Sequence, residues 1–215
     1  MALGLTSPTT PTRFSWVVQG APSGPDPLFD EDLASYADAV VLPTRGALVA
    51  EWLLIVPRSQ CLSAAELDAL GRQRLLLIAE EAAARVRTQV GSCVTFEHGA
   101  GRLGSLSGCG VDQAHLHIVG GPSISLETLA SLVANVDWQA ADHRDPWATI
   151  PAGSDYLVIR DKSQTLSAIV SRPVSQRLRR AVATALGRPD EWDYRSHPHA
   201  ENALLTKQIF RGKLS

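Results

Sequence analysis

The chain has 215 residues, of which 45% are hydrophobic, and its formal net charge is −2. This length suits one domain, or one domain with an elaborated end, and allows a sizeable core. The small net charge argues against a nucleic acid as partner, because a polyanion asks for a basic face, so we expect a small ligand. The cysteines are odd in number and lack metal-ligand spacing, which disfavours a disulfide framework and predicts a cytoplasmic protein.

The N-terminal residues 1–27 are expected to form a flexible lead. Residues 1–25 are rich in Pro, Thr, Ser and Gly and lack the basic and apolar regions of a signal peptide. No apolar run reaches the roughly 18 residues of a membrane span, so no membrane is expected as partner. Within the lead, residues 14–18 (FSWVV) are predicted either to add a strand or to pack across the sheet.

The next segments predict a β-hairpin and a helix. Residues 39–43 and 47–56 bracket Thr44-Arg45-Gly46, where the glycine is expected to take the turn. Residues 63–66 (SAAE) match a capping box, and the segment that follows, to about Thr88, is predicted as a long helix. Residues 93–97 and 114–119 are then expected to pair as antiparallel strands across a glycine-rich loop.

The second half predicts a further unit of helices and strands. A helix is expected after Ser125, and residues 155–160 and 166–171 predict a second hairpin. Pro173 is expected to open an amphipathic helix that ends near Leu186.

The predicted organisation is a single domain of class α+β, with a mainly antiparallel sheet and packed helices. Its parts are the lead 1–27, a core over 28–135, and a C-terminal extension over 136–215 that packs on the core.

Residues 113–119 (QAHLHIV) carry the strongest functional signal. Side chains alternate between the faces of a strand, so Gln113, His115 and His117 share one face. Two imidazoles there lie roughly 6.5 Å apart, close enough to reach different oxygens of one phosphate. A solvated strand face would also be polar, but it does not explain histidines beside a glycine-rich tract.

A zinc or iron site is a second interpretation of the two histidines. It needs further ligands, for which His98, Glu97 or Asp112 are candidates. No His-x-x-x-His or Cys-x-x-Cys spacing supports it, so we expect no metal.

The same residues resemble the signature of the histidine triad (HIT) superfamily of nucleotide hydrolases and transferases. That signature is His-φ-His-φ-His-φ-φ, with φ apolar, and here Gln113 replaces the first histidine. Residues 53–58 (LLIVPR) look like the family's strand that ends in a Pro-basic turn, and residues 96–99 (FEHG) look like the strand that feeds its glycine loop. Residues 175–180 (SQRLRR), followed by Trp-Asp, resemble longer bacterial HIT-like proteins. The resemblance implies a HIT-like fold.

The resemblance also implies covalent catalysis. The family's middle histidine, here His115, attacks the α-phosphorus of a nucleotide and forms a nucleotidyl-histidine. This attack needs a neutral imidazole, normally with Nδ1–H donating to a backbone carbonyl. His117 and the backbone N–H groups around Cys109 and Gly110 would hold the phosphate oxygens.

The implied activity is hydrolysis at the α-phosphate of a nucleoside polyphosphate, dinucleotide or phosphoramidate. Two alternatives stay open: a nucleotidyltransferase or phosphorylase that uses the same intermediate, and a catalytically weakened nucleotide-binding protein. Shorter family members dimerise, and the resemblance leaves a homodimer open here, since the extension could cover the same surface.

Three departures from the family bear on the site. Two positions that are commonly histidine and lie close together are Gln60 and Gln113 here, an amide pair that cannot titrate near neutrality. Many members carry Gly-Gln-Ser where residues 108–110 read GCG, so side-chain donors are replaced by backbone. The implied catalytic residues are His115, His117 and Gln113, without cofactor or metal, and the implied substrate-binding residues are Gln60, Glu97, His98, Gly99, Gly108, Cys109, Gly110, Gln176 and Arg180.

Overall fold

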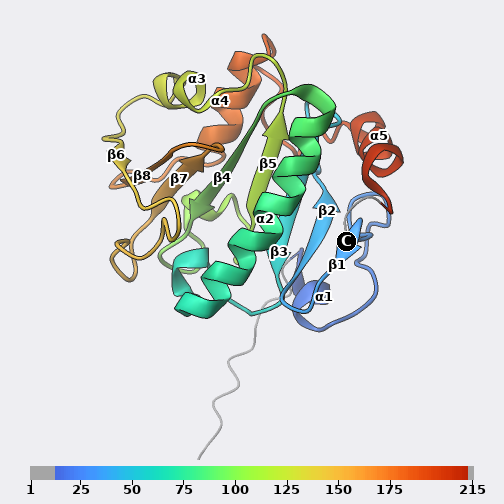
Figure 1. Cartoon of the computed structure of the whole chain (residues 1–215), viewed down its shortest axis with the longest axis horizontal. Coiled ribbons are helices and arrows are strands. Elements are labelled where there is room, and N and C mark those ends of the chain that lie inside the picture. The colour runs from blue at the N-terminus through green and yellow to red at the C-terminus, as the bar shows by residue number, and fades with distance from the viewer. Residues whose placement is uncertain (1–12, 213–215) are drawn as a thin grey trace, which may run out of the picture.

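The computed structural model describes residues 13–212, and the part of the expected lead over 1–12 lies outside this range. Its centre is an eight-stranded sheet in the order β1-β2-β3-β5-β4-β7-β8-β6 (Figure 1). Neighbouring strands are antiparallel, which confirms the predicted α+β class with an antiparallel sheet. The strands are β1 Ala34–Ser35, β2 Ala39–Pro43, β3 Trp52–Pro57, β4 Cys93–Gly99, β5 Leu116–Gly120, β6 Gln139–Ala140, β7 Tyr156–Arg160 and β8 Thr165–Ile169.

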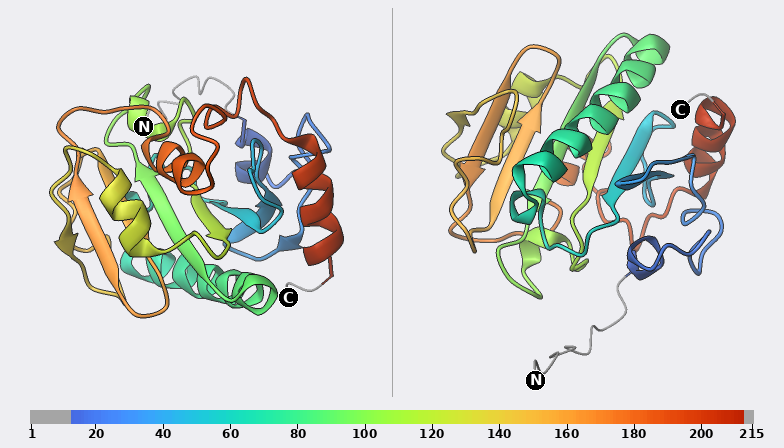
Figure 2. Two further views of the ribbon diagram at one scale, coloured as in Figure 1. Left: turned by 90° about the horizontal axis from the view of Figure 1, so that it is seen from above. Right: turned by 60° about the horizontal axis from the view of Figure 1, so that its bottom comes forward.

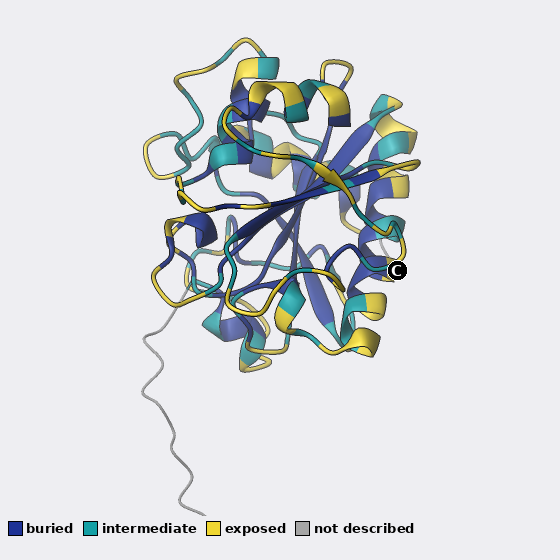
Figure 3. Ribbon diagram, turned by 90° about the vertical axis from the view of Figure 1, so that its left-hand side faces the viewer, coloured by how far each residue is buried: buried dark blue, intermediate teal, exposed yellow. Residues whose placement is uncertain are grey.

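Helices cover both faces of the sheet. The long helix α2 lies across one face, and α3 and α4 lie on the other (Figure 2). Figure 3 shows the strands between them as a largely buried layer, with exposed residues gathered in the loops and on the outer helix surfaces. The helices are α1 Ser15–Val18, α2 Ala69–Val90, α3 Leu126–Leu132, α4 Arg177–Ala185 and α5 Ala200–Phe210, with short 3-10 turns at Ala64–Glu66 and Leu106–Gly108.

Strand β5 lies in the middle of the sheet, and both of its faces are buried. Leu116 and Ile118 belong to the apolar cluster under α2. His117 points to the opposite face, where its neighbours across the ladders are Leu54 of β3 and Phe96 of β4. Those two residues belong to separate apolar clusters, one packed by α1 and one by α3 and α4. The polar side of the motif therefore lies between two hydrophobic clusters rather than in solvent.

The pairings of both predicted hairpins and the antiparallel pairing across the glycine loop are confirmed, but the second strand of the first hairpin begins at Trp52 rather than at residue 47, so its loop spans 44–51. Strand β2 pairs with β3, β4 with β5, and β7 with β8. Strand β4 also pairs with β7, so the sheet is continuous between the expected core and the expected C-terminal extension. The division between those two parts stays a prediction.

The capping-box prediction is wrong about where the long helix begins. Residues Ala64–Glu66 form a separate 3-10 turn, because Leu67 has an extended backbone with ψ at 151°. Helix α2 begins at Ala69, and the Asp68 carboxylate caps it by accepting from the Gly71 N–H at 2.7 Å. Glu66 instead accepts from the Leu62 N–H, also at 2.7 Å.

Residues 14–18 follow the second of the two predicted alternatives: they form the short helix α1, whose apolar side packs across strands β2 and β3, and add no strand. Two other segments differ from expectation. Helix α4 begins at Arg177 rather than near Pro173, because Gln176 has a left-handed backbone with φ at +58°. Helix α5, at the C-terminal end, had no counterpart in the sequence analysis. No helix within residues 13–212 is both long and apolar enough to cross a bilayer.

Gly46→Ala is expected to destabilise the turn between β2 and β3. Gly46 has φ at +72°, and an added Cβ would lie 2.6 Å from the Tyr194 Cβ and 2.7 Å from the Arg179 Nη2. Gly187→Ala is the matched control, since Gly187 has φ at +71° with nothing within 4 Å of an added Cβ. Urea unfolding should show that Gly46→Ala costs about 1 kcal/mol more than Gly187→Ala, beyond the strain that both share. Equal losses would contradict the close packing at Gly46.

Candidate active site

Two histidines of the motif line one small cavity, and a third lies beside them. The ring centroids of His115 and His117 are 5.1 Å apart, and those of His117 and His98 are 6.1 Å apart. His117 lies in β5, His115 just before it, and His98 at the end of the neighbouring β4. All three side chains are buried. The structure thus brings His115 and His117 together as the alternation predicts.

The local backbone determines the tautomer of His115. Its Nδ1 lies 2.9 Å from the Gln113 carbonyl oxygen, and a carbonyl can only accept, so Nδ1 carries the proton. Nε2 is left with its lone pair. Burial lowers the pKa of His115 to about 4, with Arg13 and Arg179 acting in the same direction and the Gln113 hydrogen bond acting against it. The ring is therefore neutral at pH 7, as a nucleophile must be.

His117 has the opposite tautomer. The indole Nε1 of Trp52 donates to its Nδ1 at 3.1 Å, so the proton sits on Nε2. The ring stacks on Phe96 with centroids 4.6 Å apart. Burial, and then the proximity of His115, lower its pKa well below the ordinary value. Nε2 is buried and has no hydrogen-bond partner among the described residues. The Nε2–H group of His117 is therefore a hydrogen-bond donor of fixed orientation.

His98 anchors helix α4. Its Nε2 accepts from the Leu178 N–H at 2.8 Å, in the first turn of that helix. Burial lowers the pKa of His98 to about 3, so the ring stays neutral and able to accept. His98 does not line the cavity. Its position supports a structural role behind His117.

Helix α4 brings Arg179, a residue that the sequence analysis did not select, to the cavity. Its side chain is only 2% exposed, and the guanidinium carbon lies 4.5 Å from the centre of the Trp52 ring. Burial lowers the pKa of Arg179 to about 10, which leaves it charged at pH 7. Arg180, which was selected, stacks on Trp192 and donates to the Ser175 carbonyl outside the cavity.

Helical periodicity could have separated the two arginines. Leu178, Val182 and Leu186 mark the apolar side of the predicted helix. At 100° per residue Arg179 lies beside that stripe, whereas Arg180 lies nearly opposite it.

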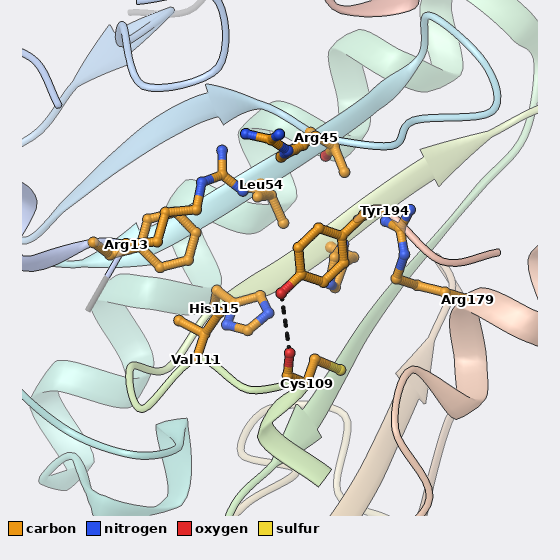
Figure 4. Close-up of a pocket in the computed structure, with 11 residues that line it drawn as sticks. Arg13, Arg45, Leu54, Cys109, Val111, His115, Arg179 and Tyr194 are labelled. Atoms are coloured by element: carbon orange, nitrogen blue, oxygen red, sulfur yellow. Dashed lines mark hydrogen bonds between the residues drawn. The ribbon is translucent and has the colours of Figure 1, made fainter. Parts of the chain in front are cut away.

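The cavity is small and partly covered. Its volume is about 20 Å³, close to the space of one water molecule. Tyr194 reaches across it, and its hydroxyl donates to the Cys109 carbonyl at 3.1 Å (Figure 4). Arg195 donates to the same oxygen at 3.0 Å. A nucleotide can enter only if this cover moves. The lining residues are Arg13, Phe14, Thr44, Arg45, Leu54, Cys109, Val111, His115, His117, Arg179 and Tyr194.

The predicted amide pair of Gln60 and Gln113 does not form. Gln113 Nε2 donates to the backbone carbonyls of Pro57 and Ser59, at 3.1 and 2.9 Å, which uses both of its hydrogens. Gln60 is exposed and lines a separate 450 Å³ pocket next to Arg74. Gln113 thus joins the end of β3 to the motif, but Gln60 lies away from the histidines.

Glu97 and Gly99 also lie away from the cavity. Glu97 alternates with Phe96 and His98 along β4, so its carboxylate is on the α2 face of the sheet. It accepts from the Trp147 indole and the Tyr156 hydroxyl, both at 2.7 Å, and burial raises its pKa to about 7. At Gly99 an added Cβ would lie 2.1 Å from the Tyr156 ring, so this glycine makes room for the tyrosine.

The glycine loop lines the cavity through Cys109, but much of its backbone is already bonded. The N–H groups of Gly108 and Cys109 donate to Ser105 and Leu106 within the 3-10 turn, so these expected phosphate donors are occupied. Gly110 faces Arg195, whose Nη2 would lie 2.5 Å from an added Cβ. Burial raises the pKa of the Cys109 thiol to about 11, which favours a space-filling role over a reactive one.

Gln176 supports the site from behind. Its Oε1 accepts from the Arg179 Nε at 3.1 Å, and its Nε2 donates to Asp193 at 3.0 Å. The residue therefore holds Arg179 and the covering segment in place without lining the cavity. Within residues 13–212, no group of three or more His, Cys, Asp or Glu side chains could hold a metal ion.

Comparison with known proteins finds similar chains among the solved structures. No protein-family model and no curated protein matches it. A solved structure, described as a Hit-like protein involved in cell-cycle regulation from Bartonella henselae with an unknown ligand, is similar to this chain. The sequence identity is 13% and the TM-score is 0.44, over 56% of this chain and 84% of that one.

His115 is expected to remain neutral well into the acidic range. Burial lowers its pKa to about 4 from the ordinary 6.5, whereas the unfolded chain takes up this proton near pH 6.5. The contribution of neutral His115 to the free energy of unfolding is thus present above pH 6.5. It is lost as the pH falls toward 4, by at most ~1.4 kcal/mol per pH unit. Imidazole nitrogen shifts followed by NMR should show no titration of His115 between pH 7 and 5. A midpoint near 6.5 would contradict the burial of this ring.

Glu97 should change stability in the opposite sense. Because burial raises its pKa from 4.5 to about 7, its contribution is complete below pH 4.5 and is lost as the pH rises through 7. Glu97→Gln removes this contribution, which offsets part of the stability that the protein loses on acidification. Between pH 7.5 and 4.5, the free energy of unfolding should therefore fall more steeply on acidification in Glu97→Gln than in the parent protein. Parallel curves of unfolding free energy against pH would contradict the raised pKa.

Proposed function

We propose that the protein hydrolyses nucleotides at the α-phosphate through a nucleotidyl-His115 intermediate. One observation carries the proposal: His115 commits Nδ1–H to the Gln113 carbonyl and lines the cavity as a neutral ring whose Nε2 is left to react. His117 lines the same cavity, and its buried Nε2–H has no hydrogen-bond partner among the described residues. A nucleophile and an oxyanion donor side by side suit attack on phosphorus.

The first half-reaction forms the covalent intermediate. The lone pair of His115 Nε2 forms a bond to the α-phosphorus, and the bond from phosphorus to the leaving group breaks, with its electron pair departing on that group. The imidazole then carries a positive charge. The Gln113 carbonyl stabilises that charge through the Nδ1–H bond, while His117 Nε2–H donates to a phosphoryl oxygen.

The second half-reaction returns the enzyme to its starting state. Water attacks the phosphorus, the phosphorus–nitrogen bond breaks, and its electron pair returns to Nε2. A proton from the attacking water passes to solvent, and a nucleoside monophosphate leaves. A transferase or phosphorylase would share the first step and replace water with another acceptor, so dependence of product on an added acceptor separates the two reactions.

His115→Ala is expected to abolish formation of the adduct. The protein should be mixed with a panel of nucleotides, quenched, and analysed by mass spectrometry for a nucleotidyl group on His115, whose mass names the nucleotide. His143→Ala is the control, because His143 is a histidine outside the cavity that bonds Thr165 and Arg160. Adduct on the parent protein and on His143→Ala, but not on His115→Ala, supports the proposal. Turnover that persists in His115→Ala removes His115 from the mechanism.

The leaving group is expected to decide the rate. Gln113 cannot supply a proton, since its amide does not titrate and both hydrogens are bonded to backbone carbonyls. His117 is neutral and therefore a poor acid. A dinucleoside polyphosphate releases a stable anion, whereas a phosphoramidate releases an amine that needs a proton.

At pH 7 we expect turnover of a dinucleoside polyphosphate to exceed that of an alkyl phosphoramidate of the same nucleoside by about 100-fold, the usual scale of general acid catalysis. Steady-state rates with the nucleoside found in the adduct provide the measurement. A faster phosphoramidate reaction would mean that another group supplies the proton.

A further inference from the structure

One of the three arginines that line the cavity has no ion pair among the described residues. Of its three lining arginines, Arg13 pairs with Asp30 at 3.0 Å and Arg45 pairs with Asp26 at 3.2 Å. Among residues 13–212, Arg179 forms no ion pair with a carboxylate, although it is the most deeply buried of the three. A buried charge without a partner costs free energy, so an unpaired one at a cavity wall indicates a site for an anion.

The protein orients Arg179 through neutral acceptors. The Nε donates to Gln176 Oε1 at 3.1 Å and to the Trp192 carbonyl at 3.3 Å, and Nη2 donates to the Gly46 carbonyl. None of the hydrogen bonds between described residues involves Nη1. Guanidinium has five donors in a planar fork. Donors thus remain for a ligand after the side chain has been held in place.

Trp52 links Arg179 to His117. The guanidinium lies over the indole ring at 4.5 Å, and the indole N–H of the same residue donates to His117 Nδ1 at 3.1 Å. One aromatic side chain therefore sets the position of the cation and of the unpartnered His117 Nε2–H together. Both groups line the cavity beside His115.

We propose that Arg179 is the group that binds the substrate's phosphate, supplying from helix α4 a charged donor where two N–H groups of the glycine loop are already bonded. The N–H groups of Gly108 and Cys109 are occupied within their own turn, and residues 108–110 (GCG) carry no side-chain amide or hydroxyl. The proposal rests on the proposed function, because it assigns the charge on the phosphate that His115 would attack. A planar fork bonds two phosphate oxygens at once and neutralises their charge.

The test measures binding separately from chemistry. Calorimetric titrations with inorganic phosphate, adenosine 5′-monophosphate and adenosine should be made on the parent protein and on Arg179→Met, Arg179→Lys and Arg177→Met. Arg177→Met is the matched control, since Arg177 lies on the same helix, is not part of the cavity lining and donates to the Arg172 carbonyl.

Arg179→Met should weaken binding of inorganic phosphate and of the monophosphate by about tenfold or more, the scale of a charge-assisted hydrogen bond, without changing the affinity for adenosine. Arg177→Met should bind as the parent does. Arg179→Lys, which keeps the charge without the fork, should lose less affinity than Arg179→Met and serves as the test variant if the methionine variant does not fold.

The outcomes separate this proposal from the proposed function. Phosphate binding that is absent from the parent, or that is unchanged in Arg179→Met and Arg179→Lys, overturns the role of Arg179 even if His115 forms an adduct. Equal losses for adenosine and the monophosphate also overturn it, because they indicate collapse of the cavity. A selective loss of phosphate affinity in a protein that never forms a His115 adduct supports Arg179 and overturns the covalent mechanism.

Discussion

Desolvation of the imidazoles at the middle of the sheet is the constraint on which the site depends. A buried ring must be neutral, and a neutral ring has one donor and one acceptor, so each nitrogen has to be matched to its surroundings. The Gln113 carbonyl, the Trp52 indole and the Leu178 N–H each satisfy one nitrogen of His115, His117 and His98. The other nitrogen of each ring has no hydrogen-bond partner among the described residues, and His115 and His117 line the cavity.

This constraint explains why the site draws on so many distant segments. His98 lies in β4, His115 just before β5 and His117 in β5, but the groups that bond their rings come from β3, from the turn before β5 and from α4. Helix α4 is itself held to the sheet by His98, so the imidazole behind the cavity also places Arg179 at its rim. The site is therefore a property of the packed sheet and helices rather than of the motif alone.

Local sequence patterns predicted the hairpins, the strand pairing across the glycine loop and the shared face of His115 and His117. The same period of two places Glu97 on the opposite face from His98. The N-terminal cap at Asp68 is local as well, since its carboxylate accepts from the Gly71 N–H three residues on. Two features could not be read from such patterns: Gln176 has a left-handed backbone and bonds Asp193, 17 residues further on, and Tyr194 bonds the Cys109 carbonyl 85 residues back. Gln60 does not pair with Gln113 as the family resemblance implied, because Gln113 donates both of its amide hydrogens to the carbonyls of residues 57 and 59.

The attachment of the C-terminal region to the β2–β3 turn has a consequence for the order of folding. Arg179 bonds the Gly46 carbonyl across 133 residues, and Asn202 and Thr206 of α5 bond the carbonyls of Ala47 and Ala50 across 155 and 156 residues. Contacts of such separation form late, because the intervening chain must first be closed into a loop. During synthesis strands β1 to β5 emerge before α4 and α5. His115 and His117 thus leave the ribosome in a chain that already contains Arg13 and Arg45 but still lacks Arg179, the cavity arginine that has no ion pair among the described residues.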